Sequence, residues 1–237
     1  MAKTKKVIFV IVEGLTDQDA LGPIFKTIFS SSEVHFHIIR VDITTEDGIS
    51  SRNAKSYVAK RISVEMKRYA YRDSDIVQIV HLIDTDGAFI PPEEVKQRTE
   101  KGTVYYLDHI ETSSVDYIIR RNQQKCAVVS SLCSTGKMKG RIPYSIYYFS
   151  RNMEHALHNV SSDLTDDQKE ELADKFADKY ENHPEAFLSF IKSAEIAVPG
   201  TYTQTWDYIR SDINSLQRHS NLQILFEQEN LMPDSEQ

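Results

Sequence analysis

Two apolar stretches of this 237-residue chain each lead into acidic residues, and this arrangement limits the fold more than any other feature. The run VIFVIV at residues 7–12 precedes Glu13, and the run at residues 75–83 precedes the sequence DTDG at 84–87. Continuous β-branched and apolar runs are typical of strands buried on both faces of a parallel sheet. Ligands bind beyond the carboxyl ends of such strands, so both acidic segments are predicted to meet at one edge.

Helical periodicity alternates with the apolar runs in the first two thirds of the chain. The predicted strands span residues 7–12, 34–41, 75–83 and 144–150, and the predicted helices lie near residues 17–28, 51–69, 113–131, 152–159, 164–181, 184–194 and 202–217. We therefore predict an α/β fold with a mainly parallel sheet, helices on both faces and an α-helical C-terminal extension. The expected division is a domain at residues 1–160, with an insertion at about 90–112, and a helical subdomain at 161–237.

The acidic residues have a spacing that indicates a cation site. Glu13 and Asp17 are four residues apart around a predicted helix start, while Asp84 and Asp86 flank one residue at a strand end. Neighbouring carboxylates repel unless a cation neutralises them, and oxygen ligands without His or Cys favour magnesium, manganese or calcium over zinc. The competing interpretation is a pair of helix-capping acids and an ordinary turn, which explains either motif alone equally well. The two motifs together favour a metal site.

Basic residues are concentrated in two parts of a chain whose net charge is -7. No Asp or Glu occurs at residues 117–153, a window that holds Arg120, Arg121, Lys125, Lys137, Lys139, Arg141 and Arg151. The second cluster comprises Lys55, Lys60, Arg61, Lys67, Arg68 and Arg72. Solvated helix faces would explain each cluster, but a phosphate-binding surface on an acidic protein would also have this distribution.

The N-terminal residues and the cysteines indicate a cytoplasmic location. The basic and then apolar start resembles a signal peptide, but its apolar run is short and Glu13 follows it, so a first strand is predicted instead. No stretch is apolar and long enough to span a membrane. Cys126 and Cys133 have no accompanying His or Cys cluster, and we expect them to be buried thiols in a reducing compartment.

The sequences VEGLTD at residues 12–17 and IDTDG at 83–87 resemble the two signature motifs of Toprim domains. The likeness is closest to the nucleases of the OLD (overcoming lysogenization defect) family, and it covers about residues 5–155. It implies that Glu13 and Asp84 bind one magnesium ion, that Asp86 binds the same or a neighbouring ion, and that Asp17 belongs to the OLD-type extension of the first motif. Manganese is the expected substitute for magnesium.

The same resemblance implies roles for residues near the fourth predicted strand. Glu154 corresponds to an acidic residue that helps to hold a second ion, and Lys137 or Lys139 corresponds to a lysine that stabilises the phosphate. The implied activity is metal-dependent cleavage of DNA or RNA, with Glu13 able to act as a general acid or base. Defence against phage is the implied physiological role.

The chain differs from OLD proteins because it has no ATPase domain. The sequence STGK at residues 134–137 lacks the first glycine of a P-loop, and Met138 replaces the hydroxyl residue, so ATP hydrolysis is not expected. The alternative function is therefore a catalytically silent Toprim-like subunit that binds nucleic acid or protein and acts with an ATPase or effector partner. The helical tail around Trp206 would then bind the partner, whereas ordinary core packing is the competing interpretation of its apolar positions.

Overall fold

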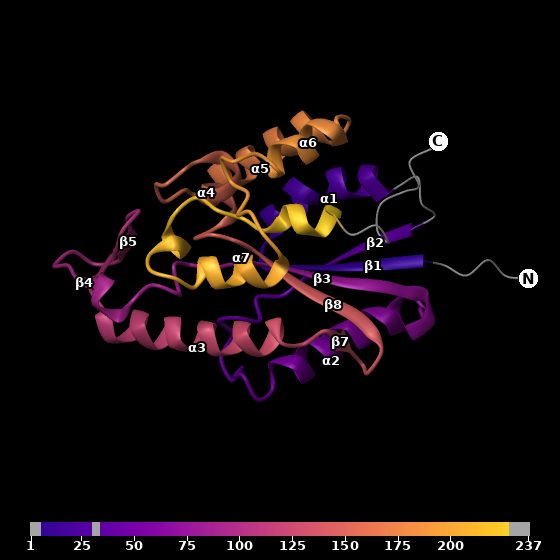
Figure 1. Cartoon of the computed structure of the whole chain (residues 1–237), viewed down its shortest axis with the longest axis horizontal. Helices are drawn as coiled ribbons and strands as arrows, with labels where there is room; N and C mark the ends of the chain where they lie inside the picture. The colour runs from indigo at the N-terminus through magenta and orange to yellow at the C-terminus, as the bar shows by residue number, and fades with distance from the viewer. Residues whose placement is uncertain (1–5, 30–33, 228–237) are drawn as a thin grey trace, which may run out of the picture.

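The computed structural model describes residues 6–29 and 34–227 and has an α/β fold, as the sequence predicts. Its main sheet has the strand order β2-β1-β3-β8-β7 (Figure 1). The strands are β1 (Lys6–Val12), β2 (Val34–Arg40), β3 (Ile76–Asp84), β7 (Lys137–Met138) and β8 (Ile142–Phe149). Pairing is parallel between β2, β1, β3 and β8, and only the edge strand β7 pairs antiparallel. This arrangement brings the carboxyl ends of β1, β3 and β8 to one edge.

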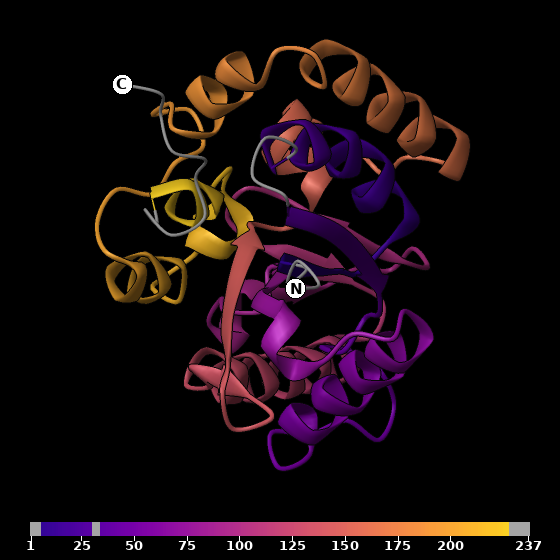
Figure 2. The same ribbon diagram turned by 90° about the vertical axis from the view of Figure 1, so that its right-hand side faces the viewer.

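Helices cover both faces of the sheet (Figure 2). The helices of one face are α1 (Leu15–Phe29), α5 (Asp166–Tyr180) and α6 (Pro184–Ile191), and those of the other are α2 (Ala54–Arg68), α3 (Val115–Cys133) and α7 (Tyr202–Ile209). Alternate β1 residues enter the two hydrophobic cores, since Ile8 and Val10 lie in the first and Phe9 and Ile11 in the second. Burial on both faces explains why β1 is a continuous apolar run.

The segment after residue 160 shares these cores with the sheet. Phe176 of α5 and Phe187 of α6 lie in the same cluster as Ile8, and Trp206 of α7 lies in the cluster of Phe9. Trp206, Ile209 and Leu216 of the tail are therefore core residues, while Tyr208 is exposed. Within residues 6–29 and 34–227, no helix has both the length and the apolar content that a membrane span requires.

The predicted helix at residues 202–217 ends early. α7 stops at Ile209, and Asp212 then adopts a positive φ of 49°, which a right-handed helix does not accommodate. A short 3-10 helix, η4 (Asn214–Leu216), follows and buries Leu216. This turn brings η4 against the segment that follows β3.

The predicted insertion forms a small separate sheet beside the end of the main one (Figure 1). Its strands are β4 (Val95–Gln97), β5 (Thr103–Tyr105) and β6 (Ile110–Thr112), in the order β4-β6-β5. Ile90, Val95 and Ile110 pack with Ile118 of α3 in a third apolar cluster. The insertion therefore adjoins the edge at which the acidic motifs lie.

Candidate active site

The turn after β3 is fixed by the end of β8 and by η4. Backbone N–H groups of Thr85 and Asp86 donate to the carbonyls of Phe149 (2.9 Å) and Arg151 (2.7 Å). The Thr85 hydroxyl donates to the Ser215 carbonyl at 3.0 Å. Since Thr85 is fully buried, these bonds satisfy its polar groups and hold the acidic turn in one conformation.

The turn requires unusual backbone angles at two consecutive residues. Asp86 has a φ of 50°, which Asp tolerates better than most residues, and Gly87 has a φ of 63°. A Cβ atom on Gly87 would lie 2.4 Å from Cδ2 of the buried Leu216. Gly87 therefore allows both the reversal of the chain and the close approach of η4. The sequence prediction assumed that Asp84 and Asp86 both lie on an extended strand end and so point to the same side. The positive φ of Asp86 shows that the backbone is not extended there.

Lys125 of α3 joins the two acidic motifs. Its Nζ lies 2.5 Å from Asp86 Oδ2 and 3.7 Å from Glu13 Oε2. The Lys125 side chain is 0% exposed, while those of Glu13 and Asp86 are 12% and 31% exposed. The other Glu13 oxygen, Oε1, accepts a hydrogen bond of 2.8 Å from Thr44 Oγ1. The structure thus brings Glu13 and Asp86 to one point, around a buried ammonium group.

Burial and mutual repulsion raise the pKa values of the strand-end carboxylates. The pKa of Glu13 rises to about 8, mainly because the group is desolvated, and Asp86 and Asp42 add to this rise while Lys125 opposes it. The pKa of Asp84 lies well above its usual value, again first through burial and then through Asp17, Glu13 and Asp86. Lys125 has a raised pKa despite its burial, because the carboxylates around it stabilise its charge. The positive charge therefore only partly offsets the negative charge of the site.

Asp17 and Glu154 form the side of the site nearest α1. α1 begins at Leu15, two residues before the predicted start, and Asp17 Oδ2 accepts the Gly14 N–H at 2.7 Å. Burial raises the pKa of Asp17 to about 6, and repulsion by Glu154 adds to this effect. Glu154 lies in the first turn of α4 (Met153–His158), with Lys169 Nζ 3.8 Å from its Oε1. The structure therefore brings Glu154 towards Asp17, and the role of Glu154 as a ligand of a second ion stays a prediction.

Lys137 and Lys139 lie at the opposite end of the sheet. Lys137 is in β7, opposite Pro143 near the start of β8, and Lys139 follows in the connecting turn. Lys139 Nζ donates to Asp73 at 2.8 Å, just before β3 begins. Since β3 and β8 run parallel, these lysines lie at the amino ends of the strands and do not face the acidic edge. The structure does not support the phosphate-stabilising role that the resemblance implies for them.

Sequence reasoning missed Lys125 as a member of the site, although the helix pattern contains a signal for it. Ile118, Asn122, Val129 and Leu132 form the buried stripe of α3, and Lys125 lies on that same stripe. A lysine at a core-facing helix position requires an anionic partner, because an unpaired buried charge is very costly. Asp42 and Thr44 were missed as well. Their place in the chain could have indicated them, because both follow the carboxyl end of β2, at the same edge of the sheet as Glu13.

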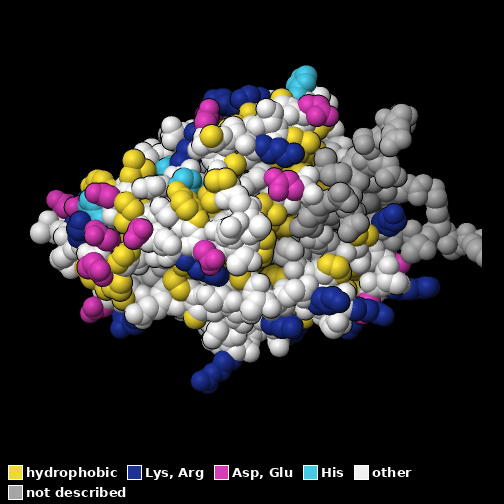
Figure 3. All heavy atoms as spheres, viewed as in Figure 1, with side chains coloured by type: hydrophobic (Ala, Val, Ile, Leu, Met, Phe, Trp, Pro, Cys, Tyr) yellow, Lys and Arg dark blue, Asp and Glu magenta, His cyan; other side chains and the backbone are white. Residues whose placement is uncertain are grey.

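Pockets lined by arginines flank the acidic residues. One of about 570 Å³ is lined by Glu13 and Asp42 together with Arg40, Arg61, Arg68 and Tyr69. Another of about 480 Å³ is lined by Asp86 together with Tyr117, Arg120, Arg121 and Gln124. On the face in Figure 3, Lys and Arg side chains are spread along the lower edge, where α2 and α3 lie, and do not form one compact patch. The basic residues nearest to the candidate site are therefore the arginines that line these two pockets.

The donor atoms of the site suit a hard cation, but their arrangement is not that of a ready-made metal cage. Carboxylate oxygens of this kind favour magnesium, manganese or calcium. Across residues 6–29 and 34–227, however, the structure contains no group of three or more His, Cys, Asp or Glu side chains already placed to hold an ion. Lys125 lies between two of the expected ligands, so cation binding would require the carboxylates and Lys125 to adjust.

Comparison with known proteins adds no relative from which a role could be transferred. No family model, no curated protein and no solved structure matches this chain.

Proposed function

We propose that this chain is a metal-dependent nuclease with an OLD-type Toprim site. The observation that supports it best is the set of carboxylates at the carboxyl ends of neighbouring parallel strands, where burial and repulsion raise the pKa values of Glu13, Asp17 and Asp84. Strongly perturbed carboxylates gathered at the ligand-binding edge of an α/β sheet are typical of catalytic sites. The two signature-like motifs of the sequence support the same conclusion.

Glu13, Asp84 and Asp86 would hold magnesium or manganese, with Asp17 and Glu154 on the side where a second ion would bind. A bound ion of this kind polarises phosphoryl oxygens and lowers the pKa of a coordinated water. The protein would supply the negative charge that attracts the ion and a rigid turn that fixes Asp86. Repulsion within the site favours cation binding, because a divalent ion would stabilise the ionised forms of these groups.

In this proposal Lys125 takes the role that the sequence resemblance gives to Lys137 or Lys139. Its ammonium group lies 2.5 Å from Asp86 and 3.7 Å from Glu13, buried behind the carboxylates that an approaching phosphate would meet. A fixed positive charge there would stabilise negative charge that develops on the phosphate during cleavage.

The flanking pockets support nucleic acid as the substrate. Arg61 and Arg68 lie beside Glu13, and Arg120 lies beside Asp86, so a strand that crosses the carboxylates would have cations for its phosphates on both sides. Exposed Tyr69 and Tyr117 offer ring surfaces next to these arginines. DNA and RNA both have this chemistry. A role in phage defence rests on the family resemblance alone, and the cytoplasmic location rests on the cysteines and the N-terminal residues.

The ion pair of Lys125 favours a second candidate, a catalytically silent subunit that binds nucleic acid or protein. In such a subunit Lys125 would supply permanently the positive charge that a metal supplies in an active enzyme. Trp206, Ile209 and Leu216 of the tail are buried and would not form its partner surface, whereas Tyr208 is exposed. An ATPase or effector partner would have to bind elsewhere on the molecule.

The deciding experiment is cleavage by the purified chain. Supercoiled plasmid, linear DNA and RNA are incubated with wild type and with Asp84→Asn, in magnesium, in manganese or in chelator. Asp73→Asn is the matched control, because Asp73 is a paired carboxylate at the other end of the sheet. The nuclease proposal predicts cleavage that requires metal, is lost in Asp84→Asn and is kept in Asp73→Asn. Stable binding without cleavage by any of the three proteins would establish the silent subunit instead.

A further inference from the structure

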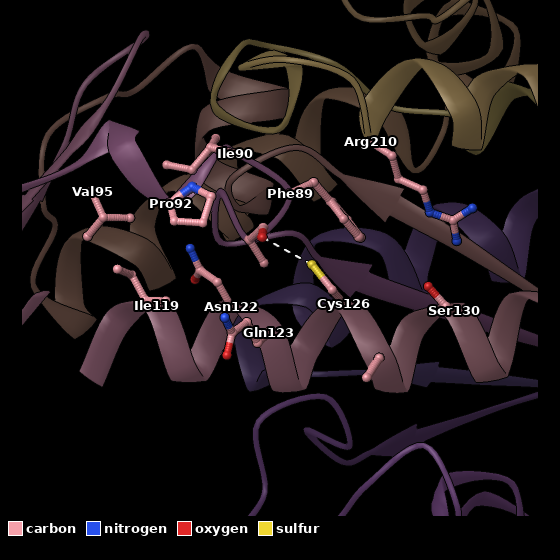
Figure 4. A pocket seen from close by; sticks show the side chains of 12 residues that line it. Phe89, Ile90, Pro92, Val95, Ile119, Asn122, Gln123, Cys126, Ser130 and Arg210 are labelled. Carbon is pink, nitrogen blue, oxygen red and sulfur yellow. Dashed lines mark hydrogen bonds between the residues drawn. The ribbon is translucent and has the colours of Figure 1, made fainter. Parts of the chain in front are cut away.

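A pocket of about 540 Å³ beside α3 has no part in the proposed reaction (Figure 4). Its floor is a single stripe of α3 that includes Ile119, Cys126 and Ala127, residues at helical spacing on one face. Its wall is the segment from Ala88 to Val95, directly after the acidic turn. The volume is typical of small-molecule sites, which are mostly apolar with a few polar groups.

The pocket is apolar at one end and cationic at the other. Figure 4 shows Ile90, Pro92, Val95 and Ile119 together at one end, while Arg210 extends its guanidinium group at the opposite end. Arg210 directly follows the last residue of α7, so the C-terminal end of α7 forms this end of the pocket. A ligand that fits this shape has an extended apolar body and one polar head.

Arg210 has no anionic partner within the described part of the protein. Its guanidinium lies over the rings of Trp206 and Phe89, at 5.1 and 5.9 Å from their centroids. Its Nε is buried and makes no hydrogen bond. None of the ion pairs among residues 6–29 and 34–227 includes Arg210. The guanidinium group is therefore a cation without an anionic counterpart among the described residues, and an anion in the pocket would supply one.

No other ionised group lines the pocket. The thiol of Cys126 donates to the Ala88 carbonyl at 3.1 Å, and burial raises its pKa to about 11, so it is neutral near pH 7. The remaining lining residues are apolar or carry neutral amide and hydroxyl groups. Arg210 therefore gives the pocket a net positive charge at one end, which is complementary to an anion.

We propose that this pocket binds a small amphipathic organic anion, with its carboxylate paired to Arg210 and its hydrocarbon part along α3 towards Val95 and Ile119. A carboxylate matches the paired donors of a guanidinium group, and the apolar end removes the hydrocarbon from water. The proposal does not depend on nuclease activity, because neither the carboxylates of the acidic edge nor Lys125 line this pocket.

Binding of decanoate to the full chain, measured by calorimetry below its micelle concentration, tests the proposal. Arg210→Gln removes the charge, and Ala127→Trp fills the pocket from an exposed helix position. Arg52→Gln is the matched control, because it removes an exposed arginine outside the pocket. 1-Decanol, a neutral ligand of equal chain length, separates the contribution of the carboxylate from that of the apolar body.

The expected result is saturable decanoate binding to wild type and Arg52→Gln, at least about tenfold weaker binding to Arg210→Gln, and loss of binding to Ala127→Trp. Decanol should bind wild type more weakly than decanoate does, and Arg210→Gln should remove that difference. Absence of binding to wild type would overturn the proposal. Equal affinities of decanoate for wild type, Arg210→Gln and Ala127→Trp would overturn it as well, since decanoate would then bind elsewhere.

Discussion

The two ends of the central sheet carry similar side chains, but their charges are balanced in opposite ways. At the amino ends of the strands, Asp73 accepts hydrogen bonds from Lys139 (2.8 Å) and Arg141 (3.2 Å). The bond from Lys139 is the main reason that the pKa of Asp73 is lowered. At the carboxyl ends, the pKa values of Glu13 and Asp84 are raised, because burial and repulsion outweigh the attraction of Lys125.

This contrast separates a structural charge cluster from a candidate functional one. Ion pairs near the surface are largely satisfied by each other and by water, and they contribute little to stability. Carboxylates that share a buried site raise one another's pKa values, and such strongly perturbed groups are typical of functional sites. The predictions below test whether the two ends differ as this interpretation requires.

The largest expected effect is on activity. Glu13→Gln should lower metal-dependent cleavage at least about 100-fold, because it removes a candidate ligand and general base. Asp73→Asn should leave the rate within about twofold, since a surface ion pair contributes little. Initial rates at saturating magnesium give both values, and circular dichroism checks the fold. Similar losses in both variants would remove the distinction between the two ends of the sheet.

Substitution of the central lysine tests the electrostatic contrast directly. In chelator, Lys125→Met should destabilise the fold by about 3 kcal/mol, because it leaves Glu13 and Asp86 without their buried cation. Lys139→Met at the other end should cost less than about 1 kcal/mol, since its partner Asp73 keeps Arg141. Urea unfolding measures both changes. Equal stability of the two variants would show that the buried cluster at the carboxyl ends depends on its lysine no more than the surface cluster does.

The pH dependence of stability should have opposite signs at the two ends. Glu13 has a pKa of about 8 in the folded state and 4.5 as its ordinary value, so folding takes up a proton between these values. Stability from this group is therefore fully present below pH 4.5 and is lost as the pH rises through 8. Asp17 should add a smaller fall as the pH rises through about 6.

Asp73, whose pKa is lowered, should instead lose stability as the pH falls through its folded pKa. Melting temperatures of wild type and Glu13→Gln, measured in chelator across this range, check these signs. Between pH 4.5 and 8, the melting temperature of Glu13→Gln should decrease less than that of wild type. Magnesium should raise the melting temperature of wild type more at pH 8.5 than at pH 5. A wild-type profile identical to that of the variant would contradict the raised pKa.

The smallest expected effect concerns the backbone of the acidic turn. Gly87→Ala places a Cβ atom 2.4 Å from Leu216 Cδ2 at a φ of 63°, so it combines a backbone penalty with overpacking. Gly140→Ala, in the turn between β7 and β8, has a φ of 79° and no atom within 4 Å of the added Cβ. Gly87→Ala should therefore be less stable than Gly140→Ala by about 1 kcal/mol. Equal unfolding midpoints would show that η4 adjusts freely to the turn.

Several features of the site were predictable from the sequence, because each depends on local pattern. The continuous run at residues 7–12 and the largely apolar segment at 75–83 predicted β1 and β3, and the acidic residues that follow them were expected at one edge of a parallel sheet. The structure confirms the α/β fold and brings Glu13 and Asp86 to a shared point. Glu154 was expected only as a ligand of a second ion, which stays a prediction; its closeness to Asp17, seen in the repulsion between the two groups, comes from the structure.

Other features depend on contacts between distant segments, and the sequence could not supply them. Lys125 belongs to the site because α3 packs across the edge of the sheet and directs its ammonium towards Asp86, 39 residues away in the chain. Lys139 has a similar local sequence context of basic residues, yet it follows β7 at the far end of the sheet. Charge composition did not distinguish these lysines, because only the packing of α3 and the direction of β8 set their positions.

The sequence alone predicted the parallel strands of the main sheet and the helices between them, since periodicity and β-branched content act over a few neighbours. It also determined that acidic side chains would follow two of the strands. Only the tertiary structure decided which cation faces them, how far burial raises their pKa values, and where Arg210 lies relative to α3. These properties follow from solvent exclusion and from distances between segments far apart in the chain, and both arise only when the helices pack against the sheet.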